Sequence, residues 1–365
     1  MHAGSVMVAL PVFGAVLPDT QPSIMFAALP RCVFWLALFI CQGGLNAQTA
    51  DLLVVNKVPN TSGKPGSLSF IDYAAGEVTG AVTVDREPHE VALTPDGRYA
   101  LVANTGGYVT PNNTLSLVDV SSRTVKHTVD LGPLYTPHGL AYSQANGLFY
   151  FTAEGSRAIG AYDPEANELV WLQGTGQAGS HMLLVSADGR TVVLANRGDA
   201  SVSILTLEGD DPLAAAAWNG TIVPVGERPE ALAFGPDESV VWVGMRSGEG
   251  LVTIDLDSAA VRDRFPVGGH DIGRLLFSPD GGSLIGADPS AGSVLFIDPH
   301  TGELEKEVPV GSTAASLFIP PAGTHLLVGV SSDDHIAEID LATRKITRRL
   351  ESGPQPDAMA WPGRE

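Results

Sequence analysis

Histidine recurs at one position of a repeated strand pattern. His89, His138 and His181 each lie at the start of a short apolar stretch, in PHEVAL, PHGLAY and SHMLLV. His270 lies close to the same position further along the chain. Neutral imidazole is a common ligand of transition metals, and three such rings leave coordination positions free for water or substrate. The spacing therefore suggests a site for a divalent transition metal.

Acidic and polar side chains occupy neighbouring repeat positions. Glu154 and Glu230 are candidate general bases, because a carboxylate beside a metal-bound water or substrate can move a proton. The other candidates are ligand-binding side chains, which stand at the ends of second strands or on a long connection between strands: Asn56, Asn104, Tyr108, Asn196 and Arg246.

Each of these patterns also has a structural interpretation. A Pro-His pair can begin a strand with its imidazole bonded to backbone groups, and a repeat duplicates its residues whether or not they bind anything. Asparagine at a strand end often serves a turn. Both interpretations remain open from the sequence.

The elements that must position these side chains come from an internal repeat. A strand that ends in a turn occurs seven times, as PHEVALTPDG, PHGLAYSQANG, SHMLLVSADG, RPEALAFGPDE, IGRLLFSPDG, AASLFIPPAG and QPDAMAWPG. Three further short strands follow each of the first six copies, separated by Gly, Pro, Asn or Asp turns. Four strands per repeat predict one blade of a β-propeller.

The two ends of the repeat region are out of phase. The N-terminal part begins with a second, a third and a fourth strand (DLLVVNK, GSLSFID, GEVTGAVTV), whereas the C-terminal part stops after a lone first strand, DAMAW. Joining them would complete one blade and remove two open sheet edges. The sequence therefore predicts an all-β fold, a seven-bladed β-propeller spanning residues 48–365 as one domain.

The motifs in PHEVALTPDGRYALVANTG and LLVSADGRTVVLANRG resemble the YVTN-type β-propeller repeat family, which is related in fold to the amine dehydrogenase heavy chain and to lactonase-type propellers. The resemblance covers about residues 51 to 361. It implies the propeller fold and leaves function open, since propellers of this kind include binding proteins and enzymes.

Residues 25–47 have the pattern of a secretory signal peptide. Arg31 supplies the positive charge, Cys32 to Cys41 the apolar segment, and Leu45 to Ala47 a small-residue cleavage site. Residues 1–24 are interpreted as a mis-assigned N-terminal extension. The mature protein would then be exported, periplasmic or secreted, without a transmembrane segment or cysteine. A lipid anchor at Cys41 is the rival interpretation, disfavoured by the bulky Ile40.

Charge and missing motifs narrow the function. With 41 acidic and 21 basic residues, the chain has a net charge of −20, which argues against nucleic acid as a partner. No Walker loop, GxSxG elbow or haem-attachment motif occurs. We expect a monomeric propeller that binds a small polar ligand, a metal or a protein segment on its funnel face. The alternative is a metal-dependent lactone hydrolase, lyase or oxidase using the histidine cluster.

Overall fold

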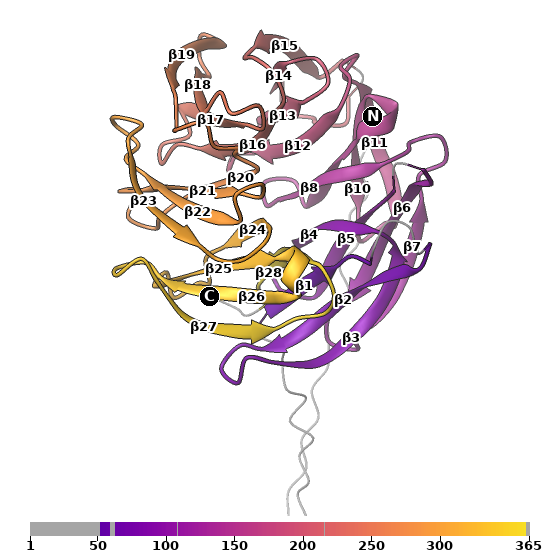
Figure 1. Ribbon diagram of the computed structural model, residues 1–365. Helices are drawn as coiled ribbons and strands as arrows, with labels where there is room; N and C mark the ends of the chain where they lie inside the picture. The colour runs from indigo at the N-terminus through magenta and orange to yellow at the C-terminus, as the bar shows by residue number, and fades with distance from the viewer. Residues whose placement is uncertain (1–51, 59–62, 108, 215, 363–365) are drawn as a thin grey trace, which may run out of the picture. The chain divides into compact units, whose positions relative to one another are not determined.

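The computed structural model describes residues 52–58, 63–107, 109–214 and 216–362. These residues form seven four-stranded antiparallel sheets arranged as the blades of a propeller (Figure 1). The prediction of a seven-bladed, all-β propeller is confirmed. The predicted signal peptide and Tyr108 lie outside the described residues. Within those ranges, no helix has the length and apolar character needed to cross a membrane.

Each blade is an antiparallel sheet whose first strand is innermost. Blade 1 consists of β28 (Pro356–Ala360), β1 (Leu52–Asn56), β2 (Pro65–Asp72) and β3 (Glu77–Arg86). Blades 2 to 4 consist of β4 (Pro88–Leu93), β5 (Tyr99–Gly106), β6 (Pro111–Asp119) and β7 (Thr124–Asp130); β8 (Pro137–Ser143), β9 (Leu148–Ala153), β10 (Ala158–Asp163) and β11 (Glu168–Gly174); and β12 (Ser180–Val185), β13 (Thr191–Asn196), β14 (Ser201–Leu207) and β15 (Trp218–Pro224).

Blades 5 to 7 repeat this order. They consist of β16 (Pro229–Phe234), β17 (Val240–Met245), β18 (Leu251–Asp255) and β19 (Ala260–Phe265); β20 (Arg274–Phe277), β21 (Leu284–Asp288), β22 (Ser293–Ile297) and β23 (Leu304–Pro309); and β24 (Ala314–Phe318), β25 (His325–Val330), β26 (His335–Asp340) and β27 (Lys345–Glu351). Single 3₁₀ turns, η1 (Glu154–Ser156) and η2 (Ser331–Asp333), follow β9 and β25.

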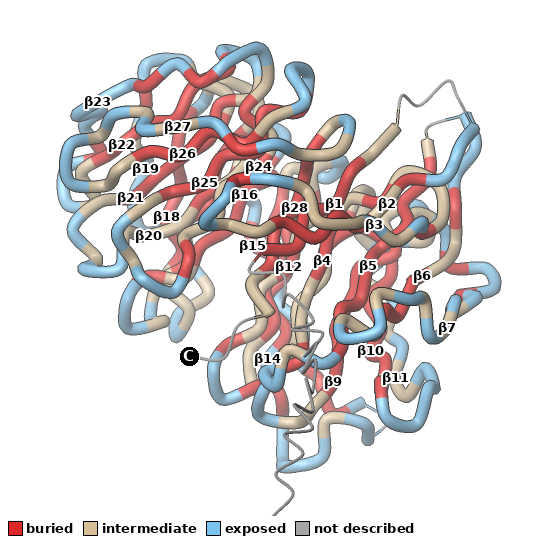
Figure 2. The backbone as a smooth tube through the Cα atoms, turned by 90° about the horizontal axis from the view of Figure 1, so that it is seen from below, coloured by how far each residue is buried: buried red, intermediate tan, exposed pale blue. Residues whose placement is uncertain are grey.

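Burial follows the position of a strand within its blade. The second strands β5 and β9 are buried along their whole length, whereas the outer strand β7 alternates between exposed and half-buried residues (Figure 2). Apolar side chains fill the space between neighbouring blades: Tyr99 and Leu101 of blade 2 share a buried cluster with Phe149 and Phe151 of blade 3. This packing between sheets fixes the central strands around the channel.

The ring closes through the two ends of the repeat region, as predicted. β28 pairs antiparallel with β1, placing Ala360 opposite Leu53 and Met359 opposite Val54. The C-terminal strand thus becomes the innermost strand of blade 1, and neither β28 nor β1 is left as an open edge at the joint.

A β-bulge occurs at the channel end of the first strand in six blades. The register of β4 against β5 shifts between Pro88 and Glu90, and that of β16 against β17 between Pro229 and Ala231. Equivalent shifts occur in β8, β12, β24 and β28. Because a bulge re-aims the inserted residue, it turns one side chain per blade toward the channel mouth.

Candidate functional site

A cavity of about 970 Å³ lies at the channel mouth and is built from equivalent positions of all seven blades. The innermost layer, which we call the inner ring, takes one residue from the start of each first strand: Asp357, His89, His138, His181, Glu230, Gly273 and Ala315. The second layer, the outer ring, takes one residue from the end of each second strand, within β5 for Thr105 and directly after the strand in the other six blades: Lys57, Thr105, Glu154, Arg197, Arg246, Pro289 and Ser331.

Three consecutive imidazoles of the inner ring form a stack. The ring centroids of His89 and His138 lie 4.8 Å apart, and those of His138 and His181 lie 3.8 Å apart with an interplanar angle of 35°. The stack arises because the same bulged position holds histidine in blades 2, 3 and 4. The structure therefore brings these three side chains together at the channel mouth.

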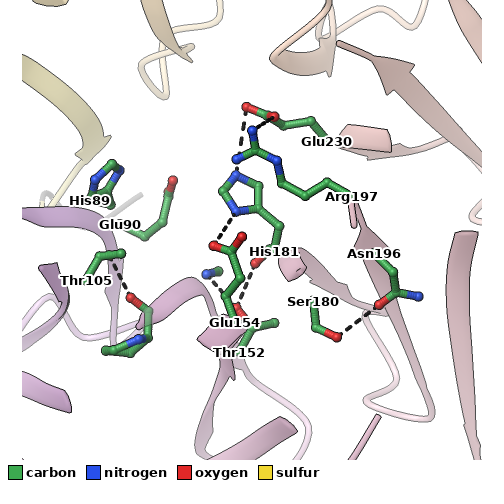
Figure 3. A network of polar contacts seen from close by, with 12 residues as sticks. His89, Glu90, Thr105, Thr152, Glu154, Ser180, His181, Asn196, Arg197 and Glu230 are labelled. Atoms are coloured by element: carbon green, nitrogen blue, oxygen red, sulfur yellow. Dashed lines mark hydrogen bonds and ion pairs between the residues drawn. The ribbon is translucent and has the colours of Figure 1, made fainter. Parts of the chain in front are cut away.

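His181 lies between two carboxylates. Its Nδ1 is 3.1 Å from Glu154 Oε2, and its Nε2 is 3.8 Å from Glu230 Oε1 (Figure 3). Burial lowers the pKa of His181, but the hydrogen bond to Glu154 and the nearby negative charge of Glu230 outweigh this effect and raise the pKa above its usual value. His181 thus favours the charged, imidazolium form.

The other two imidazoles favour the neutral form. Burial, together with the positive charge of Lys57, lowers the pKa of His89 to about 4, although its Nδ1 lies 3.1 Å from Asp357 Oδ2. Burial and the charge of His181 hold the pKa of His138 well below its usual value. His138 is 4% exposed, and its Nδ1 has no hydrogen-bond partner. The three rings of the stack therefore differ in pKa, which is raised at His181 and lowered at His89 and His138.

Glu230 is shared by several cations at one side of the cavity. Arg246 Nη1 lies 3.1 Å from Glu230 Oε1, and Arg197 Nη2 lies 3.4 Å from Glu230 Oε2. Burial raises the pKa of this carboxyl, but the nearby His181 ring and the positive charges of Arg197 and Arg246 reverse the effect and hold the pKa far below its usual range. Glu230 is therefore a permanent anion.

A second ion pair crosses the channel one residue deeper than the inner ring. Arg274 of blade 6 reaches Glu90 of blade 2, with Nη2 2.6 Å from Oε1, and lies 3.7 Å from Asp357 Oδ1. Lys57 also pairs with Asp357, at 2.8 Å. The side chains of Arg274 and Glu90 are only 16% and 11% exposed, so this pair is largely buried where it joins blade 6 to blade 2.

One known protein family matches this chain. The family described as "Lactonase, 7-bladed beta-propeller" matches residues 54–262, which is more than half of the chain. The chain belongs to this lactonase family. No curated protein matches it significantly.

Solved structures similar to this lactonase-family propeller support the fold alone. Hydrazine synthase from Kuenenia stuttgartiensis is 15% identical with a TM-score of 0.61, over 74% of this chain and 88% of that chain. The dihydro-heme d1 dehydrogenase NirN, in complex with DHE, is 16% identical with a TM-score of 0.61, over 90% of this chain and 78% of that chain.

The structure corrects the expected placement of three asparagines in this lactonase-family chain. Asn56, Asn104 and Asn196 are fully buried and do not line the cavity. Asn196 donates to Ser203 Oγ at 2.8 Å and accepts from Ser180 Oγ at 3.0 Å, so it is turned toward its own sheet (Figure 3). Side chains alternate along a strand, so the next residue faces the cavity instead.

Three of the other predicted site residues line the cavity, and one does not. Arg246, Glu154 and Glu230 line the cavity, as the repeat register predicted. His270 does not join the stack: its Nδ1 lies 2.8 Å from Asp288 Oδ2, and it is absent from the cavity lining. Blade 6 places Gly273, not this histidine, in the inner ring.

The arrangement of the rings gives no support to the predicted metal site. Among the described residues, no group of three or more His, Cys, Asp or Glu side chains is arranged to hold a metal ion. The imidazole rings lie against one another at a tilt, and those of His89 and His181 direct nitrogens at carboxylates, whereas metal ligands point their nitrogens at one centre. Binding of a transition metal stays a prediction.

Sequence reasoning missed several charged residues of the site. Lys57 and Arg197 each follow a predicted asparagine by one residue, and Arg228 and Glu87 precede first strands by one residue. The signal was available, because Glu154 and Arg246 occupy the same repeat position as Lys57 and Arg197. The repeat pattern could not predict Arg274, because this residue pairs with Glu90 of a blade on the other side of the channel.

Proposed function

We propose that this propeller binds a small organic anion, such as a carboxylate or a phosphate ester, in the cavity at the channel mouth. The observation that carries the proposal is a gathering of cations in an otherwise acidic chain of net charge −20. Five basic side chains line the cavity: Lys57, Arg197, Arg228, Arg246 and Arg274. The lining carboxylates number four, and the raised pKa of His181 adds a further positive charge.

The arginines can accept an anion without losing their internal partners. Arg246 and Arg197 share one carboxylate, Glu230, and a guanidinium has five N–H donors, which leaves donors for a ligand. A carboxylate or phosphate oxygen matches this donor geometry better than a neutral group does. Since the site is partly buried, each charge pair is weakened less by solvent than it would be on the surface.

Calorimetric titration would test this proposal directly. Inorganic phosphate and gluconate should bind the purified protein, whereas sorbitol, a neutral molecule similar in size to gluconate, should not. The variant Arg246→Gln should weaken binding of both anions by at least about tenfold, or about 1.4 kcal/mol. The control Arg262→Gln changes an exposed arginine of β19 and should have no effect. Equal binding of sorbitol, or no anion binding, would contradict the proposal.

Hydrolysis of a lactone is a second candidate, favoured by the family and by the unequal protonation of the stack. A neutral imidazole such as that of His138 can take a proton from an attacking water. The cationic His181 and the arginines could stabilise the oxyanion that forms at the lactone carbonyl. Measuring hydrolysis of glucono-lactone with the intact protein and with His138→Gln distinguishes catalysis from binding alone.

A further inference from the structure

The cavity lining is chemically divided between two groups of blades. Blades 1 to 5 supply the imidazoles and all of the lining charges except Arg274, which pairs across the channel with Glu90. Blades 6 and 7 instead present a set of small or uncharged residues, which we call the uncharged sector: Gly273, Pro289, Thr313, Ala315 and Ser331.

Gly273 presents backbone and no side chain to this sector, beside an arginine. It is not among the glycines with positive φ, so its backbone conformation does not call for glycine. A Cβ built at this position would lie 3.2 Å from Pro289 Cγ and 3.5 Å from Arg246 Cδ. The 3.2 Å contact is tighter than most Cβ contacts, so the missing side chain lets Pro289 and the Arg246 stem pack against the backbone, and Gly273 lines the cavity with backbone alone.

Ala315 likewise brings only a small side chain to the inner ring in the next blade. Its place in the inner ring is equivalent to that of His89, His138 and His181, because Ala314 and Ser316 flank the same bulge as Pro88 and Glu90. Five blades fill the inner ring with an imidazole or a carboxylate, and two adjacent blades do not. The smallest residues of the inner ring therefore lie on one side, across from the histidines.

We propose that the uncharged body of the bound organic anion lies in the uncharged sector, while its anionic group meets the arginines of blade 5. This inference rests on the proposed anion binding and adds to it a place for the rest of the ligand. Gly273 and Ala315 are then specificity-determining residues, since they set how large that body can be. A body of neutral atoms desolvates no charge in this sector, as it would against blades 1 to 5.

Two probes of different size test the inference with Ala315→Leu. Gluconate carries a body of several carbon atoms, whereas inorganic phosphate is an anionic group alone. Calorimetry should show gluconate affinity falling by about tenfold or more in this variant, with phosphate affinity changed by less than about twofold. Gly273→Ala should act in the same direction.

A matched control introduces the same leucine elsewhere in blade 7. Ala342→Leu lies on the exposed turn between β26 and β27 and should leave both affinities unchanged. Thermal unfolding of every variant verifies that the fold is retained. If phosphate binds and gluconate binds Ala315→Leu as tightly as before, or if both probes weaken equally, the inference is overturned while anion binding stands. If neither probe binds the unaltered protein, both proposals fail.

Discussion

At the scale of single residues, the histidine stack shows how one repeat position can acquire different protonation states. His181 has carboxylates near both ring nitrogens, whereas His138, its neighbour in the stack, has none at its buried Nδ1. Two adjacent cations in a buried site would repel each other strongly. The carboxylates therefore decide which ring of the pair carries the proton.

This protonation pattern predicts a loss of stability in acid. The pKa of His138 is lowered in the folded protein, so the unfolded chain binds a proton at His138 more readily as the pH falls below about 6.5. Between pH 7.5 and 5.0 we expect this residue to cost about 2 kcal/mol of unfolding free energy. His181, with its raised pKa, acts in the opposite direction over the same range.

Urea unfolding of the unaltered protein and of His138→Gln at the two pH values measures this difference. The variant keeps His89, Lys57 and Arg274 and lacks only the group in question. Its stability should fall less on acidification than that of the unaltered protein. Identical pH dependences would show that His138 takes up a proton in the folded state as easily as in the unfolded state.

The spacing of histidine in the sequence was sufficient to predict that three imidazoles meet. It could not predict their charges, because the partners of His89 and His181 come from other blades. Asp357 lies 268 positions from His89 along the chain yet only 3.1 Å from it in the fold. A shift in pKa depends on such neighbours, and those become visible only once the ring is closed.

At the scale of strands, register decides which polar side chains form hydrogen bonds within the sheet and which line the cavity. The last residue of β13, Asn196, bonds to the third strand β14, and the next residue, Arg197, faces the cavity. Sequence patterns located this strand end correctly. They did not fix the side-chain direction, since a shift of one residue reverses it.

Substitutions at the neighbouring residues Asn196 and Arg197 distinguish a role in the stability of the sheet from a role in anion binding. Asn196→Ala should lower the unfolding free energy by about 1–3 kcal/mol, because it leaves buried hydroxyls without their partner, and should not change anion affinity. Arg197→Gln should weaken anion binding and cost little stability, since its pair with Glu230 is long, at 3.4 Å. Chemical unfolding and calorimetry on both variants test this; the reverse pattern would assign Asn196 to the binding site.

At the scale of the whole propeller, closure between β28 and β1 was predictable because the repeat starts and ends out of phase. The same feature makes the last strand essential. A chain ending at Gly353 lacks β28 and leaves β1 as an unpaired edge, with Leu53 and Val54 exposed. We expect this chain to lose its cooperative thermal transition and to aggregate.

A chain ending at Pro362 is the matched control, because it retains all of β28. Calorimetry and size-exclusion chromatography compare the two. A shorter chain that remained monomeric and unfolded at the same temperature as the control would show that the ring is stable without this joint.

The ion pair between Arg274 and Glu90 has a further consequence for molecular traffic. Because the pair joins blade 6 to blade 2 across the channel, it narrows the way from the cavity toward the opposite face of the ring. We expect a ligand to enter and leave through the mouth, so that arrival of a new molecule and departure of the old one compete for one passage. A compact molecule or the free end of a chain is then better suited to reach the histidines than a polymer that would have to thread through the propeller.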